Sequence, residues 1–283
     1  MKIAIDIGGT STRIAKVIDN KISDLEVFAT NAKDFNDTFV TLKKYINKVN
    51  DTIELIGICM PGPLDVKNGI VLETPNLKGW KDIKIKELFE QEFKVKVMLE
   101  NDANVAALGQ TVIRKTDNLL YFTVSTGIGS GFVINNKIFT GFSNTACEVA
   151  NANPQLTSNN DKERTGIEYF ASGINIPKQL QKLGLDVKDA REAFEILNSN
   201  SNQIVNDFFK EYANRFVQFI STAIYFLNPK IIVLGGSVVE NNKEFFEKMW
   251  PRIWEVTDDI KYKTQFEFAK DLLDATLLGC VNQ

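Results

Sequence analysis

Residues 2–18, KIAIDIGGTSTRIAKVI, and residues 118–135, NLLYFTVSTGIGSGFVIN, share one plan. In each stretch a run of β-branched or aromatic residues predicts a strand, glycines and hydroxyl residues predict a tight turn, and a second apolar run predicts a returning strand. A third short strand is expected after each pair, followed by helix, strand, helix, strand and helix. Because this order occurs twice, the sequence predicts an α/β protein with two similar domains and a ligand cleft between them.

The spacing of apolar residues gives the expected elements in more detail. Strands are expected at residues 2–7, 13–18, 22–28, 53–60, 95–99, 118–125, 132–135, 137–139, 230–234 and near Phe266. Helices are expected at residues 34–49, 84–93, 101–114, 166–183, 187–197, 203–227, 242–254 and from Leu272 onward. The expected domains are residues 1–116 and residues 117–283, the second enlarged by a helical insertion. The last helix is a candidate to pack back on the first domain.

The composition excludes several classes of protein. The chain has 283 residues, of which 44% are hydrophobic and 24% charged, so it can bury a large core and is not mainly disordered. A formal net charge of −3 argues against a nucleic-acid groove or an anionic-membrane surface. The first residues enter a strand pattern at once and reach Asp6, which predicts no signal peptide, no preceding DNA-binding helix-turn-helix and a cytoplasmic protein.

Two residue types are scarce, and their scarcity limits the chemistry. The chain has no histidine, which excludes Ser-His and Cys-His nucleophile pairs and imidazole general bases. The three cysteines, Cys59, Cys147 and Cys280, are far apart in the sequence, which argues against a thiolate zinc site or a disulfide framework. The remaining chemistry must use carboxylates, hydroxyls, backbone amides and a cation such as Mg²⁺.

The first glycine turn has the composition of a phosphate-binding site. Gly8 and Gly9 allow backbone amides to approach an anion closely, and the Thr10 hydroxyl adds a donor. Asp6, at the end of the preceding strand, suits a hydrated Mg²⁺. The alternative is an ordinary hairpin turn.

The second glycine turn supplies the same groups from the other half of the chain. It contains Thr126, Gly127 and Gly129, and an ordinary hairpin turn is again the alternative. Its position in a duplicated sequence favours two opposed phosphate-binding turns. Gly235 and Gly236 follow another buried strand and form a third place where a nucleotide could lie against backbone. Neither the P-loop motif nor the dinucleotide GxGxxG motif is present.

Carboxylates supply the candidate general base. Asn101 and Asp102 stand where a strand meets a helix, so they either cap the helix or hold a substrate hydroxyl. In the second case a carboxylate can accept the proton of an alcohol that attacks phosphorus. Glu148 and Glu168 are further candidates, with solvated surface acids as the alternative.

Taken together, these motifs resemble those of the ROK family (repressor, open reading frame, kinase), which comprises bacterial sugar kinases and sugar-responsive regulators with the actin-like, ribonuclease H-like fold. The resemblance covers almost the whole chain. Its motifs are DIGGT at 6–10, PGPLD at 61–65, PNLKGW at 75–80, ENDAN at 100–104, STGIGSG at 125–131 and NPKIIVLGGSV at 228–238.

The resemblance implies ATP-dependent phosphorylation of a hexose, usually on its 6-hydroxyl, in a cleft between a sugar-side domain and a nucleotide-side domain. It implies that Asp102 is the catalytic base and that Asp6 helps to hold Mg²⁺. It also implies the binding residues: Gly8, Gly9, Thr10, Thr126, Gly127, Gly129, Gly235 and Gly236 for ATP, and Asn76, Asn101, Asp102, Glu148, Asn151 and Glu168 for the sugar. Family members are commonly dimers or tetramers, so a homodimer is expected.

The sequence departs from the family pattern in one region. Glu148 and Glu168 match two family acids, but Asn151 stands where the family has a histidine, and the zinc-binding cysteines before Glu168 are missing. No zinc is therefore expected. Asn151 can donate or accept a hydrogen bond to a sugar hydroxyl but cannot titrate near neutrality. This departure keeps two alternatives open: a non-catalytic sugar sensor, and an actin-like kinase for another small alcohol.

Overall fold

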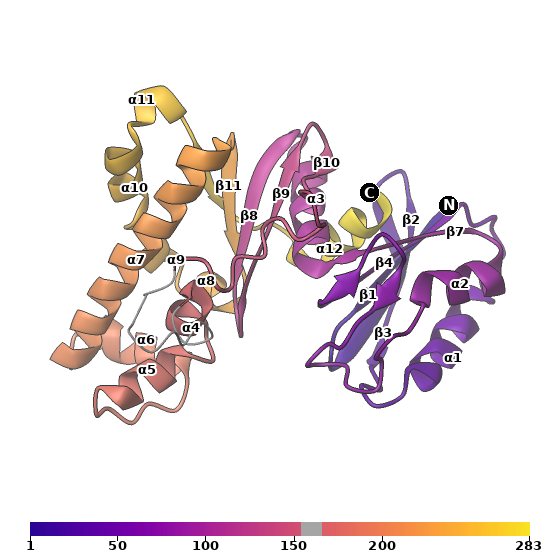
Figure 1. Ribbon diagram of the computed structural model, residues 1–283, viewed down its shortest axis with the longest axis horizontal. Helices are drawn as coiled ribbons and strands as arrows, with labels where there is room; N and C mark the ends of the chain where they lie inside the picture. Colours follow the sequence, from indigo (N-terminus) through magenta and orange to yellow (C-terminus); the bar gives the residue numbers. More distant parts are fainter. Residues whose placement is uncertain (154–165) are drawn as a thin grey trace. The chain divides into compact units, whose positions relative to one another are not determined.

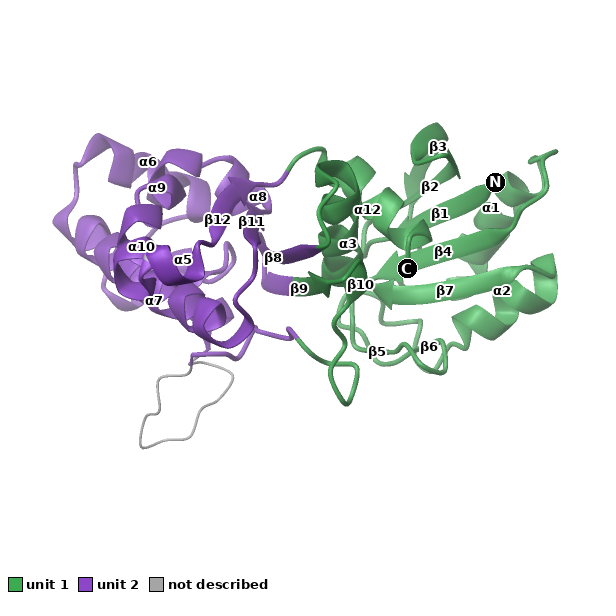
Figure 2. Cartoon of the chain, turned by 90° about the horizontal axis from the view of Figure 1, so that it is seen from above, with its two compact units in different colours: residues 1–117, 131–146, 270–283 green, residues 118–130, 147–269 purple. Residues whose placement is uncertain are grey.

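The computed structural model describes residues 1–153 and 166–283 (Figure 1). The described residues form two compact units (Figure 2). Unit 1 contains Met1–Asp117, Gly131–Ala146 and Lys270–Gln283, and unit 2 contains Asn118–Ser130 and Cys147–Ala269. The functional boundary predicted after residue 116 stays a prediction, because compactness and function need not divide a chain at the same residue.

The elements of unit 1 come from both ends of the chain. They are β1 (Lys2–Ile7), β2 (Ser11–Ile18), β3 (Lys21–Ala29), α1 (Phe35–Ile46), β4 (Leu55–Met60), β5 (Leu64–Asp65), β6 (Ile70–Val71), α2 (Ile85–Phe93), β7 (Lys96–Asn101), α3 (Asp102–Arg114), β10 (Lys137–Ile138) and α12 (Leu272–Val281).

Unit 2 contains most of the helices in the second half of the chain. Its elements are β8 (Asn118–Val124), the first part of β9 (Ile128–Ile134), α4 (Ile167–Ala171), α5 (Ile176–Lys182), α6 (Ala190–Ser199), α7 (Gln203–Leu227), β11 (Ile231–Gly235), α8 (Ser237–Glu240), α9 (Lys243–Glu247), α10 (Trp250–Thr257), α11 (Asp259–Tyr262) and β12 (Gln265–Phe268).

The two five-stranded sheets confirm the predicted duplication. Their strand orders are β3-β2-β1-β4-β7 and β10-β9-β8-β11-β12. If the five strands of each sheet are numbered by their order in the sequence, both sheets have the order 3-2-1-4-5. The parallel pairs also correspond, because β4 pairs with β1 and β7 while β11 pairs with β8 and β12. Parallel neighbours need a helical crossover between them, which explains the alternation of strand and helix read from the sequence.

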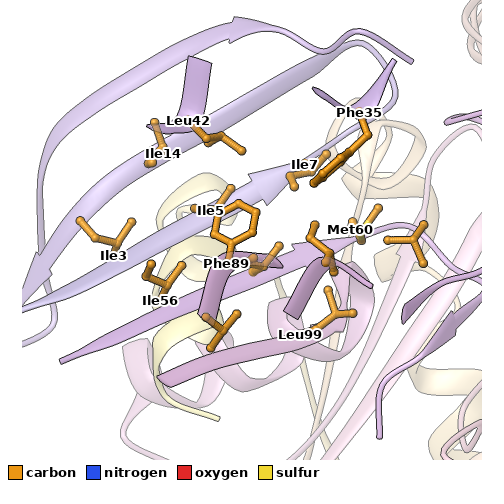
Figure 3. Close-up of a cluster of buried hydrophobic side chains, with 14 of the residues drawn as sticks. Ile3, Ile5, Ile7, Ile14, Phe35, Leu42, Ile56, Met60, Phe89 and Leu99 are labelled. Atoms are coloured by element: carbon orange, nitrogen blue, oxygen red, sulfur yellow. The ribbon is translucent and has the colours of Figure 1, made fainter. Parts of the chain in front are cut away.

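One face of the first sheet carries large apolar side chains. In β1, Ile3, Ile5 and Ile7 alternate with smaller or polar residues and point to the same face (Figure 3). They pack with side chains of α1 and α2, among them Leu42 and Phe89. The period of two in the strand and the apolar stripes of the helices therefore build one core layer.

The opposite face of the first sheet carries small residues, which let α12 approach closely. Ala4, Ala15 and Cys59 pack there with Val105 of α3 and with side chains of α12. A Cβ on Gly57 would lie 1.9 Å from the carbonyl oxygen of Cys280, so only glycine fits at that position. The first sheet is thus covered by helices on both faces.

The core of unit 2 is rich in aromatic residues and centres on α7. Phe209, Tyr212 and Phe216 of this helix are buried, and Phe246 of α9 packs against the ring of Phe216 at a centroid distance of 5.4 Å. Asn202 caps the helix by accepting the N–H groups of Ile204 and Val205.

Two helices expected to be continuous are interrupted. The stretch 166–183 divides into α4 and α5, because Ser172 is extended and the N–H of Gly173 donates to Ser125 O at 2.7 Å instead of continuing the helix. The stretch 242–254 divides into α9 and α10. Pro251 explains this second break, since proline lacks an N–H and is tolerated only in the first turn of a helix.

Within the described ranges, no helix combines the length and apolar character needed to cross a bilayer.

Candidate functional site

The first glycine turn joins β1 to β2 and lies against the loop that contains Asn76. The N–H of Gly8 donates to Ser11 O at 2.9 Å, which closes the turn. A Cβ on Gly9 would lie 2.9 Å from the Cβ of Asn76, so glycine is needed for this close approach. The structure thus brings together two sequence-predicted residues, Gly9 and Asn76, while Thr10 lies exposed beside them.

Asp6, at the end of β1, is buried and has protein partners for both carboxylate oxygens. Its Oδ2 lies 2.5 Å from Nη2 of Arg13, its cross-strand neighbour, and its Oδ1 accepts the S–H of Cys59 at 3.4 Å. Burial raises the pKa of the Asp6 carboxyl, and the positive charge of Arg13 opposes this shift. A magnesium ion bound directly by Asp6 would have to compete with the Arg13 guanidinium. Asp6 is therefore better placed to contact a hydrated Mg²⁺ through a water molecule than to coordinate the ion directly.

The join between β7 and α3 positions the candidate base. Asn101 is the N-cap of α3, and its Oδ1 accepts the N–H of Ala103 at 2.9 Å. Asp102 is exposed, and its Oδ1 accepts the same N–H at 2.8 Å. The capping role that the sequence offered for Asn101 is confirmed, and it uses the only side-chain oxygen of that residue. Binding of a substrate hydroxyl by Asn101 and Asp102 stays a prediction.

Glu100 is a neighbouring residue to which the sequence reading gave no role. It is buried, and its Oε1 accepts the backbone N–H of Asn101 at 2.8 Å and the side-chain amide of Asn104 at 2.9 Å. These bonds fix the backbone immediately before Asp102. The sequence already indicated this contact, because Glu100 and Asn104 are four residues apart, a spacing that places both side chains on one side of the helix start.

The second glycine turn, in unit 2, connects β8 to β9, but it is shorter than the sequence predicted, because β9 already begins at Ile128 and includes Gly129. The N–H of Ser125 donates to Gly127 O at 2.9 Å, and the N–H of Ile128 donates to Oε2 of Glu168 at 2.8 Å. Thr126 is exposed at the tip of the turn. Glu168 therefore contacts the predicted phosphate-binding turn, an arrangement that the sequence reading did not anticipate.

Glu148 and Asn151 lie near Glu168, although a long stretch of sequence separates them. The N–H of Glu168 donates to Ala150 O at 3.0 Å, which holds the segment around residues 148–151 beside the start of α4. Partial burial and the nearby negative charge of Glu168 raise the pKa of the Glu148 carboxyl. Glu148 and Asn151 are exposed, so both side chains are accessible to a ligand.

Gly235, the last residue of β11, and Gly236, which follows it, have a packing reason for being glycines. A Cβ on Gly236 would lie 2.5 Å from Val124 O, and this residue has a φ of +92°. A Cβ on Gly235 would lie 2.8 Å from the hydroxyl of Tyr121. The chain can therefore pass close over the end of β8 and place Ser237 beside Ser125, with their hydroxyl oxygens 3.0 Å apart.

Within unit 2, a cavity of about 780 Å³ lies beside the second glycine turn and the start of α8. Ser125, Thr126 and Ser237 line one side, and Arg191, Phe194 and Asn198 of α6 line another. Its volume is in the range of small-molecule and cofactor sites. Sequence reasoning missed the residues of α6, because they reach the cavity only through tertiary packing and no local motif marks them.

Among the described residues, no group of three or more histidine, cysteine, aspartate or glutamate side chains is arranged to hold a metal ion. Cys59 and Cys280 are buried thiols outside any disulfide, and burial raises the pKa of the Cys59 thiol well above its ordinary value.

Curated proteins resemble the chain, and two of them do so over 99% of its length. The glucokinase of Thermotoga maritima is 27% identical, with 99% of this chain and 96% of that protein covered. The xylose repressor of Caldicellulosiruptor bescii is 26% identical, with 99% of this chain and 76% of that protein covered.

Solved structures share the fold. The ROK hexokinase of Thermus thermophilus superimposes with a TM-score of 0.86 at 24% identity, covering 98% of this chain and 95% of that one. The ROK glucokinase of Streptomyces griseus, solved with glucose and AMPPNP, gives a TM-score of 0.72 at 22% identity, covering 99% of this chain and 97% of that one. The chain therefore has the actin-like fold with two α/β domains.

The model of the ROK family matches residues 2–280. Together with the six motifs and the duplicated sheet order, this match shows that the chain belongs to the ROK family.

Proposed function

We propose that this protein is an ATP-dependent kinase that phosphorylates a hexose or hexose derivative on its 6-hydroxyl. The observation that carries the proposal is the cavity of about 780 Å³ whose wall includes Ser125 and Thr126 of the second glycine turn. A cavity of this volume beside exposed backbone can hold a nucleoside while the turn contacts its phosphates. The similarity to a glucokinase over 99% of the chain supports the same reading.

In this proposal Asp102 is the general base. Its carboxylate accepts the proton of the sugar 6-hydroxyl while the hydroxyl oxygen forms a bond to the γ-phosphorus of ATP. The bond from that phosphorus to the bridging oxygen breaks, and ADP leaves with the electron pair. The capped backbone at Asn101 and the bonds of Glu100 hold Asp102 in place before the sugar arrives.

The remaining candidate residues bind and orient the two substrates. Amides and hydroxyls for the phosphates come from Gly8, Gly9 and Thr10 of one turn and from Thr126 and Gly127 of the other, with Gly129 near the start of β9. Mg²⁺ would neutralise phosphate charge, with Asp6 holding the hydrated ion through water. Asn76, Asn101, Glu148 and Asn151 are the proposed ligands of the sugar hydroxyls.

A second candidate function is a non-catalytic sugar sensor. A xylose repressor matches 99% of this chain, and Asn151 replaces the histidine of the family pattern. A sensor would bind sugar without forming ADP.

The experiment is an assay of ADP release with Mg-ATP against a panel of neutral hexoses, N-acetylated hexoses and a β-glucoside. One sugar is expected to give clear turnover. In Asp102→Asn, kcat for that sugar should fall by about 10²–10⁴-fold, because the amide cannot accept the proton. Asp186→Asn, an exposed aspartate of unit 2, is the matched control and should keep wild-type turnover.

Near-wild-type activity in Asp102→Asn would contradict the role of this residue. Sugar binding by calorimetry with no ADP formed, even at high protein concentration, would favour the sensor. Turnover with a non-sugar alcohol alone would favour an actin-like kinase of another substrate class.

A further inference from the structure

Glu168, in the first turn of α4, faces the backbone of the second glycine turn. Its Oε2 accepts the N–H of Ile128 at 2.8 Å. A Cβ on Gly127 would lie only 2.6 Å from the same oxygen. The carboxylate thus occupies the space that a side chain at residue 127 would need, and it fixes one end of the turn by a charge-assisted hydrogen bond.

The segment that follows Glu168 fixes the other end of the turn. The N–H of Gly173 donates to Ser125 O at 2.7 Å, and the N–H of Ile174 donates to Thr126 O at 3.3 Å. A Cβ on Gly173 would lie 2.7 Å from Ser125 O, so this approach also requires glycine. Residues 125–128 are therefore held at both ends by the segment that runs from α4 into α5, and the break between these helices makes those bonds possible.

The negative charge of Glu168 also affects phosphate binding at the turn. A carboxylate close to a turn that binds phosphate repels that phosphate, since like charges at short range disfavour each other. Any benefit to nucleotide binding must therefore come from the hydrogen bond to Ile128. The two effects have opposite signs, so substitutions can separate them.

We propose that Glu168 is a positioning residue for the nucleotide, which holds residues 125–128 in the conformation that binds the ATP phosphates. This inference rests on the proposed function, because it takes the turn to be a phosphate site. It differs from the sugar-binding role that the family resemblance implies for Glu168. One carboxylate oxygen of Glu168 accepts the Ile128 N–H, and the turn held in this way binds the nucleotide phosphates.

The test is ADP binding without sugar, measured by calorimetry, together with hydrogen exchange of residues 125–131 in the ligand-free protein. Glu168→Gln keeps an oxygen that can accept the Ile128 N–H and removes the charge, so ADP affinity should be unchanged or tighter. Glu168→Ala removes the acceptor, so ADP affinity should fall by about tenfold and the turn should exchange faster. Glu247→Ala, at an exposed glutamate of α9, is the matched control and should change neither quantity.

A double-mutant cycle with Gly127→Ala sharpens the test. In the wild-type background the added Cβ should displace the Glu168 carboxylate and weaken ADP binding. In the Glu168→Ala background the space is vacant, so the same substitution should have little further effect. Full additivity of the two substitutions would show that the methyl group acts on the ligand directly and would overturn the inference.

The outcomes separate the inference from the proposed function. If the wild-type protein binds ADP and Glu168→Ala binds it equally well, the inference is wrong and the proposed function stands. Tighter binding in both Glu168 variants would also overturn it, because charge alone would then be the effect. If the wild-type protein binds no ADP, the proposed function is wrong and the nucleotide role of Glu168 falls with it.

Discussion

At the scale of single residues, the site depends on short-range hydrogen bonds that fix backbone before a ligand arrives. Glu100 illustrates this, because its buried Oε1 holds both the N–H of Asn101 and the amide of Asn104. A buried carboxylate is costly unless it is well hydrogen-bonded, so these bonds stabilise the acid as well as the backbone. The position of Asp102 is therefore set partly by a residue that need not touch the substrate.

We predict that Glu100→Ala lowers the free energy of unfolding by about 1–3 kcal/mol, because it leaves buried donors without their acceptor. It should also lower kcat, since the backbone before Asp102 becomes less ordered. Glu100→Gln keeps an acceptor oxygen and should lose less of both quantities. Urea unfolding and the ADP-release assay measure the two effects, and equal activity in Glu100→Ala and wild type would contradict the positioning role.

At the scale of elements, α1 is attached to the first sheet by apolar packing and by one polar contact. Tyr45, near the end of α1, donates its hydroxyl to Asp24 O of β3 at a distance of 2.5 Å. Burial, with added contributions from the negative charges of Asp24 and Glu26, raises the pKa of Tyr45 to about 12. The folded state therefore retains this proton at a pH where the unfolded chain, with a pKa near ~10, has lost it.

The sign of the pH dependence follows. Because the folded pKa is raised, the contribution of Tyr45 is fully present below pH ~10 and is lost as the pH rises toward about 12. At pH ~7, Tyr45→Phe should be less stable than wild type by roughly 1 kcal/mol, from the lost hydrogen bond. That difference should shrink or reverse by the upper end of the window.

Urea unfolding of wild type and Tyr45→Phe between neutral pH and pH ~11.5 measures this difference, within the titration range of tyrosine. Tyr262→Phe, at a half-buried tyrosine of α11, is a control that removes a phenol hydroxyl and leaves the contact between Tyr45 and Asp24 in place. A difference that grows as the pH rises would contradict the prediction, because it would mean that the folded pKa of Tyr45 is lowered.

At the scale of the whole molecule, the order of the chain does not follow the compact units. Unit 1 begins with β1 and is completed by α12 at the far end of the sequence, where the ammonium group of Lys2 donates to Val281 O at 2.8 Å. Helix α12 also packs closely on α3, since a Cβ on Gly109 would lie 1.7 Å from Ala275 O. The first sheet therefore has an incomplete core until residues 272–281 have been synthesised.

We predict that a chain ending at Ala269 cannot form a stable unit 1. It loses the buried side chains of α12, which include Leu277, Cys280 and Val281, and several such side chains together contribute on the order of 10 kcal/mol. This is comparable to the whole stability of a typical domain. Hydrogen exchange should show unprotected β1 and β4, whereas a chain ending at Val281 should remain protected. Native protection of β1 in the shorter chain would contradict the prediction.

The sequence by itself determined the duplicated α/β plan, both glycine turns and the family. These features are local, because strand and helix periods, turn glycines and caps each depend on neighbours a few residues away. The same locality identified Asn101 as a capping candidate, and the structure confirms that it caps α3. The sequence wrongly predicted continuous helices at 166–183 and 242–254. The break in 242–254 has a local cause in Pro251, whereas the break in 166–183 depends on the bond from the Gly173 N–H to Ser125 O.

Only the tertiary structure decided which distant residues meet. The carboxylate of Glu168 accepts the Ile128 N–H, and side chains of α6 line the cavity beside Thr126. None of these contacts leaves a periodic or motif signal, because each depends on how separate elements pack. The physical reason is that hydrogen bonds and close packing act over a few ångströms in space, and folding places residues within that range regardless of their separation along the chain.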